Sequence, residues 1–183
     1  MGHDQLPLDL YAVPASITIF TSMFMHGGFM HLIGNMLYMW IFADNIEDNL
    51  GPKRFITFYL LCGICAAMTQ VIMDTHSQIP MVGASGAIGG VLGAYLINHP
   101  HAKVLVLIPL GFFSHILRIK AIYVLGFWFI LQFINSALTN PQGGGVAYAA
   151  HIGGFLSGVI LILFFNKKRK KKIKKKIIKG PWG

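Results

Sequence analysis

The stretch MVGASGAIGGVLGAYLI, residues 81–97, decides the fold. It contains one serine and five glycines, and its other side chains are mainly apolar. The helical glycines repeat at G-x-x-x-G spacing, as Gly86, Gly89, Gly90 and Gly93. Small-residue faces of this kind let the backbones of two membrane helices approach closely. The stretch therefore predicts a membrane helix over about residues 82–98 that packs tightly on a neighbour and begins near a single hydroxyl, that of Ser85.

The composition of the whole chain is that of a multi-pass membrane protein. Of its 183 residues, 55% are hydrophobic and 11% are charged, whereas soluble domains carry about 25% charged residues. A helix needs about 20 apolar residues to cross the hydrocarbon core. We therefore expect an all-α transmembrane helical bundle with five visible spans, over about residues 28–43, 55–73, 82–98, 119–138 and 146–165. Residues 104–113 are apolar but too few to span and contain Pro109, so we expect an interfacial or re-entrant piece there.

Positive charge is concentrated on one side of these spans. Ten of the fifteen Lys and Arg residues lie in 167–179, whereas residues 1–27, 74–81 and 139–145 contain none. Because cytoplasmic segments carry the excess of Lys and Arg, we expect the N-terminus outside and the C-terminus in the cytoplasm. We divide the chain into a membrane domain, 1–166, and a Lys-rich cytoplasmic tail, 167–183, that attracts anionic lipid headgroups. No aromatic residue interleaves the basic run, which argues against nucleic acid as a partner.

Two polar residues in the spans, Ser85 and His151, form a candidate site for nucleophilic catalysis. Ser85 begins a helix, where unpaired N–H groups and a partial positive charge favour an oxyanion. On the last span, His151 shares a face with Gly154 and Gly158. If the two glycine faces pack together, Ser85 Oγ should lie roughly 2.6–3.5 Å from the His151 ring, as a nucleophile and its base require. The alternatives are an N-cap role for Ser85, a packing or hydrogen-bonding role for His151, and helix dimerisation through the glycines.

A second polar pair lies near one end of the first span. His31 and Asn35 are four residues apart and therefore share one helix face. Two donors on one face can stabilise a developing negative charge, or they can simply hydrogen-bond between helices. A metal site needs three or four ligands, and no Glu, Asp or Cys is well placed to complete one. The relevant spans also contain no carboxylate to orient His151, so we infer a Ser–His dyad and not a triad.

In this order, the segments HGGFMHLIGN, GASGAIGG and AHIGG resemble the motifs of the rhomboid family of intramembrane serine proteases, and the resemblance covers nearly the whole chain. It implies that Ser85 is the nucleophile and His151 the general base. His31 and Asn35 match the pair that stabilises the oxyanion, beside the Ser85 backbone N–H. His26 matches a histidine near the mouth of the site, and Gly83 and Gly86 are expected to line it. No metal or other cofactor is implied.

The resemblance also implies what the protein does and where it works. It would cleave transmembrane segments of other membrane proteins, with its site facing outward in the plasma (inner) membrane of a prokaryote. The alternative is a non-catalytic relative that binds transmembrane helices. The family core has six helices, and we expect this chain to lack the first, which precedes a segment like LDLYAVPASITIF.

Two further positions can be compared with the family. NIEDNLG, residues 45–51, resembles a cytoplasmic loop that ties helices together, with Glu47 as its acid and Asn49 where a basic partner is usual. Some members carry an aromatic residue four after the serine, where it stacks on the histidine, and this position is Gly89 here. The two cysteines, Cys62 and Cys65, are expected to be small buried residues and not a redox pair.

Overall fold

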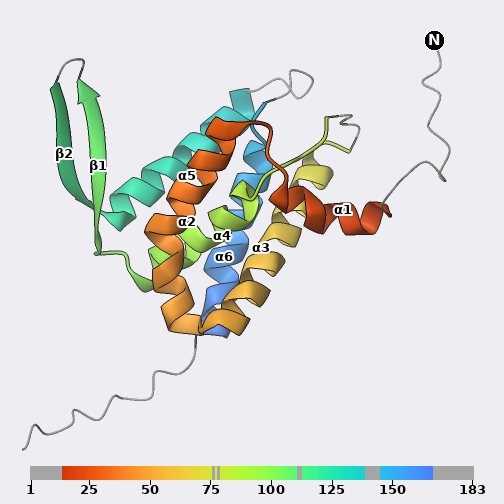
Figure 1. Cartoon of the computed structure of the whole chain (residues 1–183), viewed down its shortest axis with the longest axis horizontal. Coiled ribbons are helices and arrows are strands. Elements are labelled where there is room, and N and C mark those ends of the chain that lie inside the picture. The colour runs from red at the N-terminus through yellow and green to blue at the C-terminus, as the bar shows by residue number, and fades with distance from the viewer. Residues whose placement is uncertain (1–13, 76, 78, 111–112, 139–144, 167–183) are drawn as a thin grey trace, which may run out of the picture.

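The computed structural model describes residues 14–75, 77, 79–110, 113–138 and 145–166. Figure 1 shows a bundle of helices from which a short N-terminal helical segment and a β-hairpin extend. In chain order the described elements are α1 (Ala15–Thr21), η2 (Ser22–Phe24), α2 (Phe29–Leu50), α3 (Pro52–Met73), α4 (Ser85–Asn98), β1 (Lys103–Leu110), β2 (Phe113–Lys120), α5 (Ala121–Leu138) and α6 (Tyr148–Phe165).

Three of these helices, α3, α5 and α6, are each long and apolar enough to cross a bilayer. The α1–η2 segment and α2 pass the same test together, across a bend of 91°. The protein is therefore an integral membrane protein with several spans, and the expected helical bundle is confirmed. Among the described residues at most four of the five expected spans pass this test, because α4 is too short. The helices lie within a few residues of the expected spans, except that α2 continues to Leu50.

The helix that carries Ser85 is the most enclosed part of the bundle. In α4 every residue from Gly86 to Tyr95 is buried, because α2, α3, α5 and α6 all contact it. Its 14 residues extend only about 21 Å at 1.5 Å per residue, which is less than the roughly 30 Å of a bilayer core. Residues 79–84 before it are not helical, and Ser85 at its start is half-buried.

The glycine faces of α4 and α6 pack directly on each other, as their spacing predicts. A Cβ atom built at Gly89 would lie 3.0 Å from the backbone oxygen of His151. Cβ atoms at three further glycines would overlap backbone oxygens of the facing helix, for Gly93 that of Phe155, for Gly154 that of Gly86 and for Gly158 that of Gly90. The α4 helix is also packed closely against α3, since a Cβ atom at Gly90 would overlap the side chain of Cys62, which is fully buried.

Two features differ from the sequence-based expectations at the ends of the first span. Residues 15–24, expected to form part of an external segment without assigned structure, contain α1 and η2. The expected loop over about 44–54 is reduced to a turn at Gly51, whose φ of 81° favours glycine. Asn49 then lies in the last turn of α2, and its Nδ2 is 2.9 Å from Nε2 of His99, which caps the far end of α4.

The apolar stretch after α4 forms a β-hairpin. β1 and β2 pair antiparallel, with Lys103 opposite Lys120 at one end and Leu110 opposite Phe113 at the other. The described part of the expected interfacial or re-entrant piece over 104–113 therefore lies in strands, which was not predicted. Side chains along β1 alternate between buried and exposed, as in other strands. Val104 is 9% exposed, whereas Leu105 and Leu107 are 63% and 60% exposed. Because all these side chains are apolar, the alternation is invisible in the sequence.

Candidate active site

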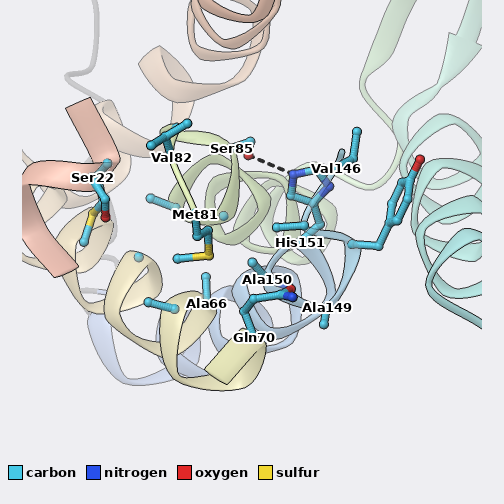
Figure 2. A pocket seen from close by; sticks show the side chains of 18 of the residues that line it. Ser22, Ala66, Gln70, Met81, Val82, Ser85, Val146, Ala149, Ala150 and His151 are labelled. Atoms are coloured by element: carbon cyan, nitrogen blue, oxygen red, sulfur yellow. Dashed lines mark hydrogen bonds between the residues drawn. The ribbon is translucent and has the colours of Figure 1, made fainter. Parts of the chain in front are cut away.

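Ser85 occupies the first position of α4, and Ala84 is the N-cap residue. The α4 N-terminus has no side-chain cap hydrogen bond. The Ser85 hydroxyl is instead 2.8 Å from Nε2 of His151, which comes from the first turn of α6 (Figure 2). The N-cap explanation for Ser85 is therefore wrong. The distance falls in the range that the glycine faces predict, because the contact between α4 and α6 brings these two side chains together.

The other ring nitrogen of His151 also has a partner, which the sequence analysis missed. Nδ1 of His151 is 2.8 Å from Oε1 of Gln132 on α5. Gln132 Nε2 in turn donates to the backbone oxygen of Trp128 at 3.3 Å. Ser85, His151 and Gln132 therefore form a continuous hydrogen-bonded row. Gln132 is a polar residue in a strongly apolar span, which is itself a signal of function, but only carboxylates were considered as partners for the histidine.

An aromatic ring lies beside His151 even though Gly89 has no side chain. The Trp128 ring centroid is 5.8 Å from that of His151, with the planes 32° apart. Trp128 and Gln132 are four residues apart on α5 and so reach the histidine from the same helix face. An aromatic side chain was expected at the position of Gly89, but the backbone of α6 fills the space beside this glycine.

His31 and Asn35 line the same cavity, beside Gly83. Gly83 has a φ of 118°, and a Cβ atom there would lie 2.7 Å from Cε1 and 2.8 Å from Nε2 of His31. The same atom would lie 3.6 Å from Nδ2 of Asn35. The Gly83 N–H donates to the backbone oxygen of Ser22 at 2.9 Å, which holds this segment in place. Glycine is therefore needed at position 83 both for its backbone conformation and for its space.

Two donors at this wall are available to a ligand. Asn35 is 5% exposed, and its Nδ2 has no hydrogen-bond partner among the described residues. His31 Nδ1 accepts from the Gly27 N–H at 3.5 Å, so in the neutral ring Nε2 carries the proton. Buried polar groups normally have partners, and an unpaired amide N–H beside the serine is suited to an anionic ligand.

The cavity has a volume of about 990 Å³, at the upper end of the roughly 300–1,000 Å³ of ligand pockets. Its lining includes Ser85, His151, His31, Asn35, Gly83 and Gly86. His26 is not among the lining residues. Its ring packs edge-on against His31 with 5.3 Å between centroids, and its Nε2 has no partner in the described part of the chain. Across the described residues, no group of three or more His, Cys, Asp or Glu could hold a metal ion.

Comparisons of the sequence with known proteins point to one family. The sequence model of the family described as Rhomboid domain matches residues 15–168. Rhomboid protein 1, mitochondrial, of Saccharomyces cerevisiae is 30% identical over 93% of this chain and 48% of its own length. Presenilin-associated rhomboid-like protein A, mitochondrial, of Danio rerio is 32% identical over 75% of this chain and 34% of its own length. The putative rhomboid protease YdcA of Bacillus subtilis is 28% identical over 78% of this chain and 64% of its own length. The chain thus covers less than two thirds of each of these relatives.

Proposed function

The chain belongs to the rhomboid family, and we propose that it is an intramembrane serine endopeptidase that cleaves transmembrane segments of other membrane proteins. The observation that carries the proposal is the 2.8 Å contact between Ser85 Oγ and His151 Nε2 inside a membrane bundle. A serine is a weak nucleophile at neutral pH and becomes reactive when an adjacent base can take its proton. A relative named as a putative rhomboid protease supports the same reaction class.

In the proposed reaction Ser85 Oγ bonds to the carbonyl carbon of a peptide bond, and its proton moves to His151 Nε2. The carbonyl oxygen becomes an oxyanion. Asn35 Nδ2–H, His31 Nε2–H and the Ser85 backbone N–H are the donors that would stabilise it, because N–H groups in the first turn of a helix have no intrahelical partner. Placed in advance and shielded from water, such donors favour the transition state over the neutral substrate.

The next steps use His151 as an acid and then as a base. The C–N bond breaks, and the imidazolium gives its proton to the leaving amine, which leaves an acyl group on Ser85. A water molecule then loses a proton to His151 as its oxygen attacks the ester carbon. The bond from this carbon to Ser85 Oγ breaks, the imidazolium returns the proton to Ser85 Oγ, and the acid product leaves and ionises in water. The described residues offer no metal cluster, and this reaction sequence needs none.

The proposed substrate is a transmembrane segment that enters the cavity in an unwound form. A peptide bond in an intact helix is shielded by its own hydrogen bonds, so the helix must open before Ser85 can reach the carbonyl carbon. The stretch before α4 is not helical, and its Met81 and Val82 line the cavity together with Ser85 (Figure 2), so no helix backbone precedes the serine there. Small substrate residues would fit best next to the close-packed α4.

We place the site on the external side of the membrane and residues 1–166 in one membrane domain. This orientation rests on the distribution of Lys and Arg, most of which lie in the tail, 167–183, outside the described residues. Binding of anionic headgroups by the tail remains a prediction. The similar proteins include mitochondrial and bacterial ones, and a prokaryotic plasma membrane remains our prediction for this chain.

Cleavage in liposomes tests the proposal. The parent and Ser85→Ala would be reconstituted with a panel of single-span segments that contain small residues and helix-weakening glycines, and products would be located by mass spectrometry. We expect cuts within the span for the parent alone. Equal cleavage by Ser85→Ala would refute the proposal, whereas stable binding of the segments without any cut would favour the non-catalytic alternative.

A further inference from the structure

We propose that Gln132 is a positioning residue, which fixes the tautomer and the ring orientation of His151. The inference rests on the proposed function, because it concerns how His151 serves as the base. Gln132 is not part of a serine–histidine dyad and touches neither Ser85 nor a substrate by any described contact. It contacts the base itself, at the ring nitrogen that faces away from the nucleophile.

The orientation of the Gln132 amide follows from its second contact. The backbone carbonyl of Trp128 can only accept a hydrogen bond, so the NH₂ end of the amide must face it. The amide oxygen then faces His151 Nδ1 at 2.8 Å. Because an amide oxygen can only accept, Nδ1 must carry the proton.

This assignment leaves the reacting nitrogen in the required state. A neutral imidazole has one N–H and one bare nitrogen, so a proton on Nδ1 makes Nε2 the acceptor for the Ser85 hydroxyl. In the opposite tautomer Nε2 would carry a proton and could not act as the base. The selection requires no charge, since the Gln132 amide performs the orienting part that a carboxylate performs in a catalytic triad.

Burial makes the hydrogen bond between Gln132 and His151 important for the orientation of the ring. Gln132 is 8% exposed and His151 is 9% exposed, so a lost hydrogen bond would not readily be replaced by bulk water. Trp128, from the same turn of α5, lies against the ring and limits its rotation. The ring is thus held along one edge by Gln132 and across its face by Trp128.

Two substitutions at Gln132 separate positioning from packing. Gln132→Leu keeps the approximate volume but removes the acceptor, and Gln132→Glu keeps an acceptor oxygen at the same reach. The matched control is Gln70→Leu. Gln70 Oε1 accepts from the Ala150 N–H at 3.2 Å, so it supports α6 one residue before His151 without contacting the ring (Figure 2).

The first readout is the rate of labelling by a fluorophosphonate, measured against pH. With a histidine base, the labelling rate rises with pH along an acid limb and then reaches a plateau. We expect Gln132→Leu to lower the plateau rate roughly 10- to 100-fold, which is part of the about 10²- to 10⁴-fold that a positioned base supplies. Its acid limb should move to lower pH, because the imidazolium loses a charge-assisted hydrogen bond. Gln132→Glu should stay within a few-fold of the parent plateau, with the acid limb at higher pH, because a carboxylate favours the imidazolium.

The controls keep this readout specific. The other titratable side chains that line the cavity are His31, Tyr38, Asp74 and Tyr148, and they are the same in every variant. Gln70→Leu should reduce the amount of folded protein and leave the acid limb at the parental pH. A parental plateau in Gln132→Leu, or an unmoved limb in both Gln132 variants, would overturn the positioning role.

The second readout does not depend on activity. Nitrogen NMR of ¹⁵N-histidine-labelled protein in detergent, with the His151 signals identified by comparison with His151→Ala, distinguishes a protonated from a bare ring nitrogen. We expect protonated Nδ1 and bare Nε2 in the parent, and averaged signals in Gln132→Leu. The same tautomer in both would overturn the inference. A parent that is never labelled would contradict the proposed function, and the spectra would still decide the role of Gln132.

Discussion

Gly154 on α6 lies so close to the carbonyl oxygen of Gly86 on α4 that a Cβ atom at position 154 would overlap it. Gly86 directly follows Ser85, and Gly154 lies three residues after His151. This backbone contact therefore sets how closely the serine and the histidine can approach. The purpose of the glycines is to bring two side chains together, and helix dimerisation is not needed to explain those on this face.

Gly154→Ala should separate α4 from α6 and weaken the Ser85–His151 contact. We expect a loss of about 1–3 kcal/mol of stability from overpacking and a fall in labelling of up to about 100-fold, as for a reacting group displaced by about 1 Å. Thermal unfolding and labelling of the folded fraction measure the two effects. Gly126→Ala on α5, where a Cβ meets no atom within 4 Å, is the matched control and should keep the labelling rate without a loss of stability. A normal labelling rate in Gly154→Ala would contradict the account.

Gly83→Ala should impair the site by a different route. The substitution forces an L side chain into a φ of 118° and pushes it against His31. Such strain costs about 1–3 kcal/mol. If the site is displaced to relieve it, we expect the labelling rate to fall at least about 10-fold. Gly51→Ala is the comparison, because Gly51 also has a positive φ but open space around it. It should lose stability while the folded protein keeps its labelling rate. If both variants behaved alike, the contact with His31 would have no special role.

Asn35→Ala should reduce turnover with little effect on folding. The Asn35 Nδ2 has no partner among the described residues, so its removal breaks no hydrogen bond of that nitrogen there. Loss of one oxyanion donor costs about 10²- to 10³-fold in kcat, and we expect a drop of roughly 10- to 1,000-fold. Steady-state cleavage gives kcat and KM separately, and kcat should carry the effect. An unchanged kcat would remove Asn35 from oxyanion stabilisation.

The pairing of α4 with α6 could be predicted from sequence because it depends on a local pattern. Glycine spacing fixes which helix faces are small, and a face with no side chains lets a neighbouring backbone approach closely. Ser85 and His151 each lie on or beside such a face, so the packing of the two faces predicts that these residues lie close together. Gly83 and Gly86 were predicted for the same reason, since they lie within two residues of Ser85 in the chain, and both line the cavity.

Gln132 and the hairpin could not be predicted in the same way. Gln132 reaches His151 only because of the rotation of α5 about its axis, which depends on packing with α6 and leaves no periodic signal in an apolar span. Its polarity marked it as unusual, but not as a partner of the histidine. In the hairpin, exposed Leu105 and buried Val104 have similar hydropathy, so alternation in burial has no counterpart in composition.

Labelling with a fluorophosphonate probe in liposomes tests the central claim, that His151 activates Ser85. The parent would be compared with Ser85→Ala, His151→Ala and a matched control, Ser157→Ala, whose hydroxyl bonds the backbone oxygen of Gly154 on α6 and does not touch the His151 ring by any described hydrogen bond. We predict labelling of the parent and of Ser157→Ala, none of Ser85→Ala, and a severe loss in His151→Ala. Labelling that persists in Ser85→Ala, or at the parental rate in His151→Ala, would contradict the account.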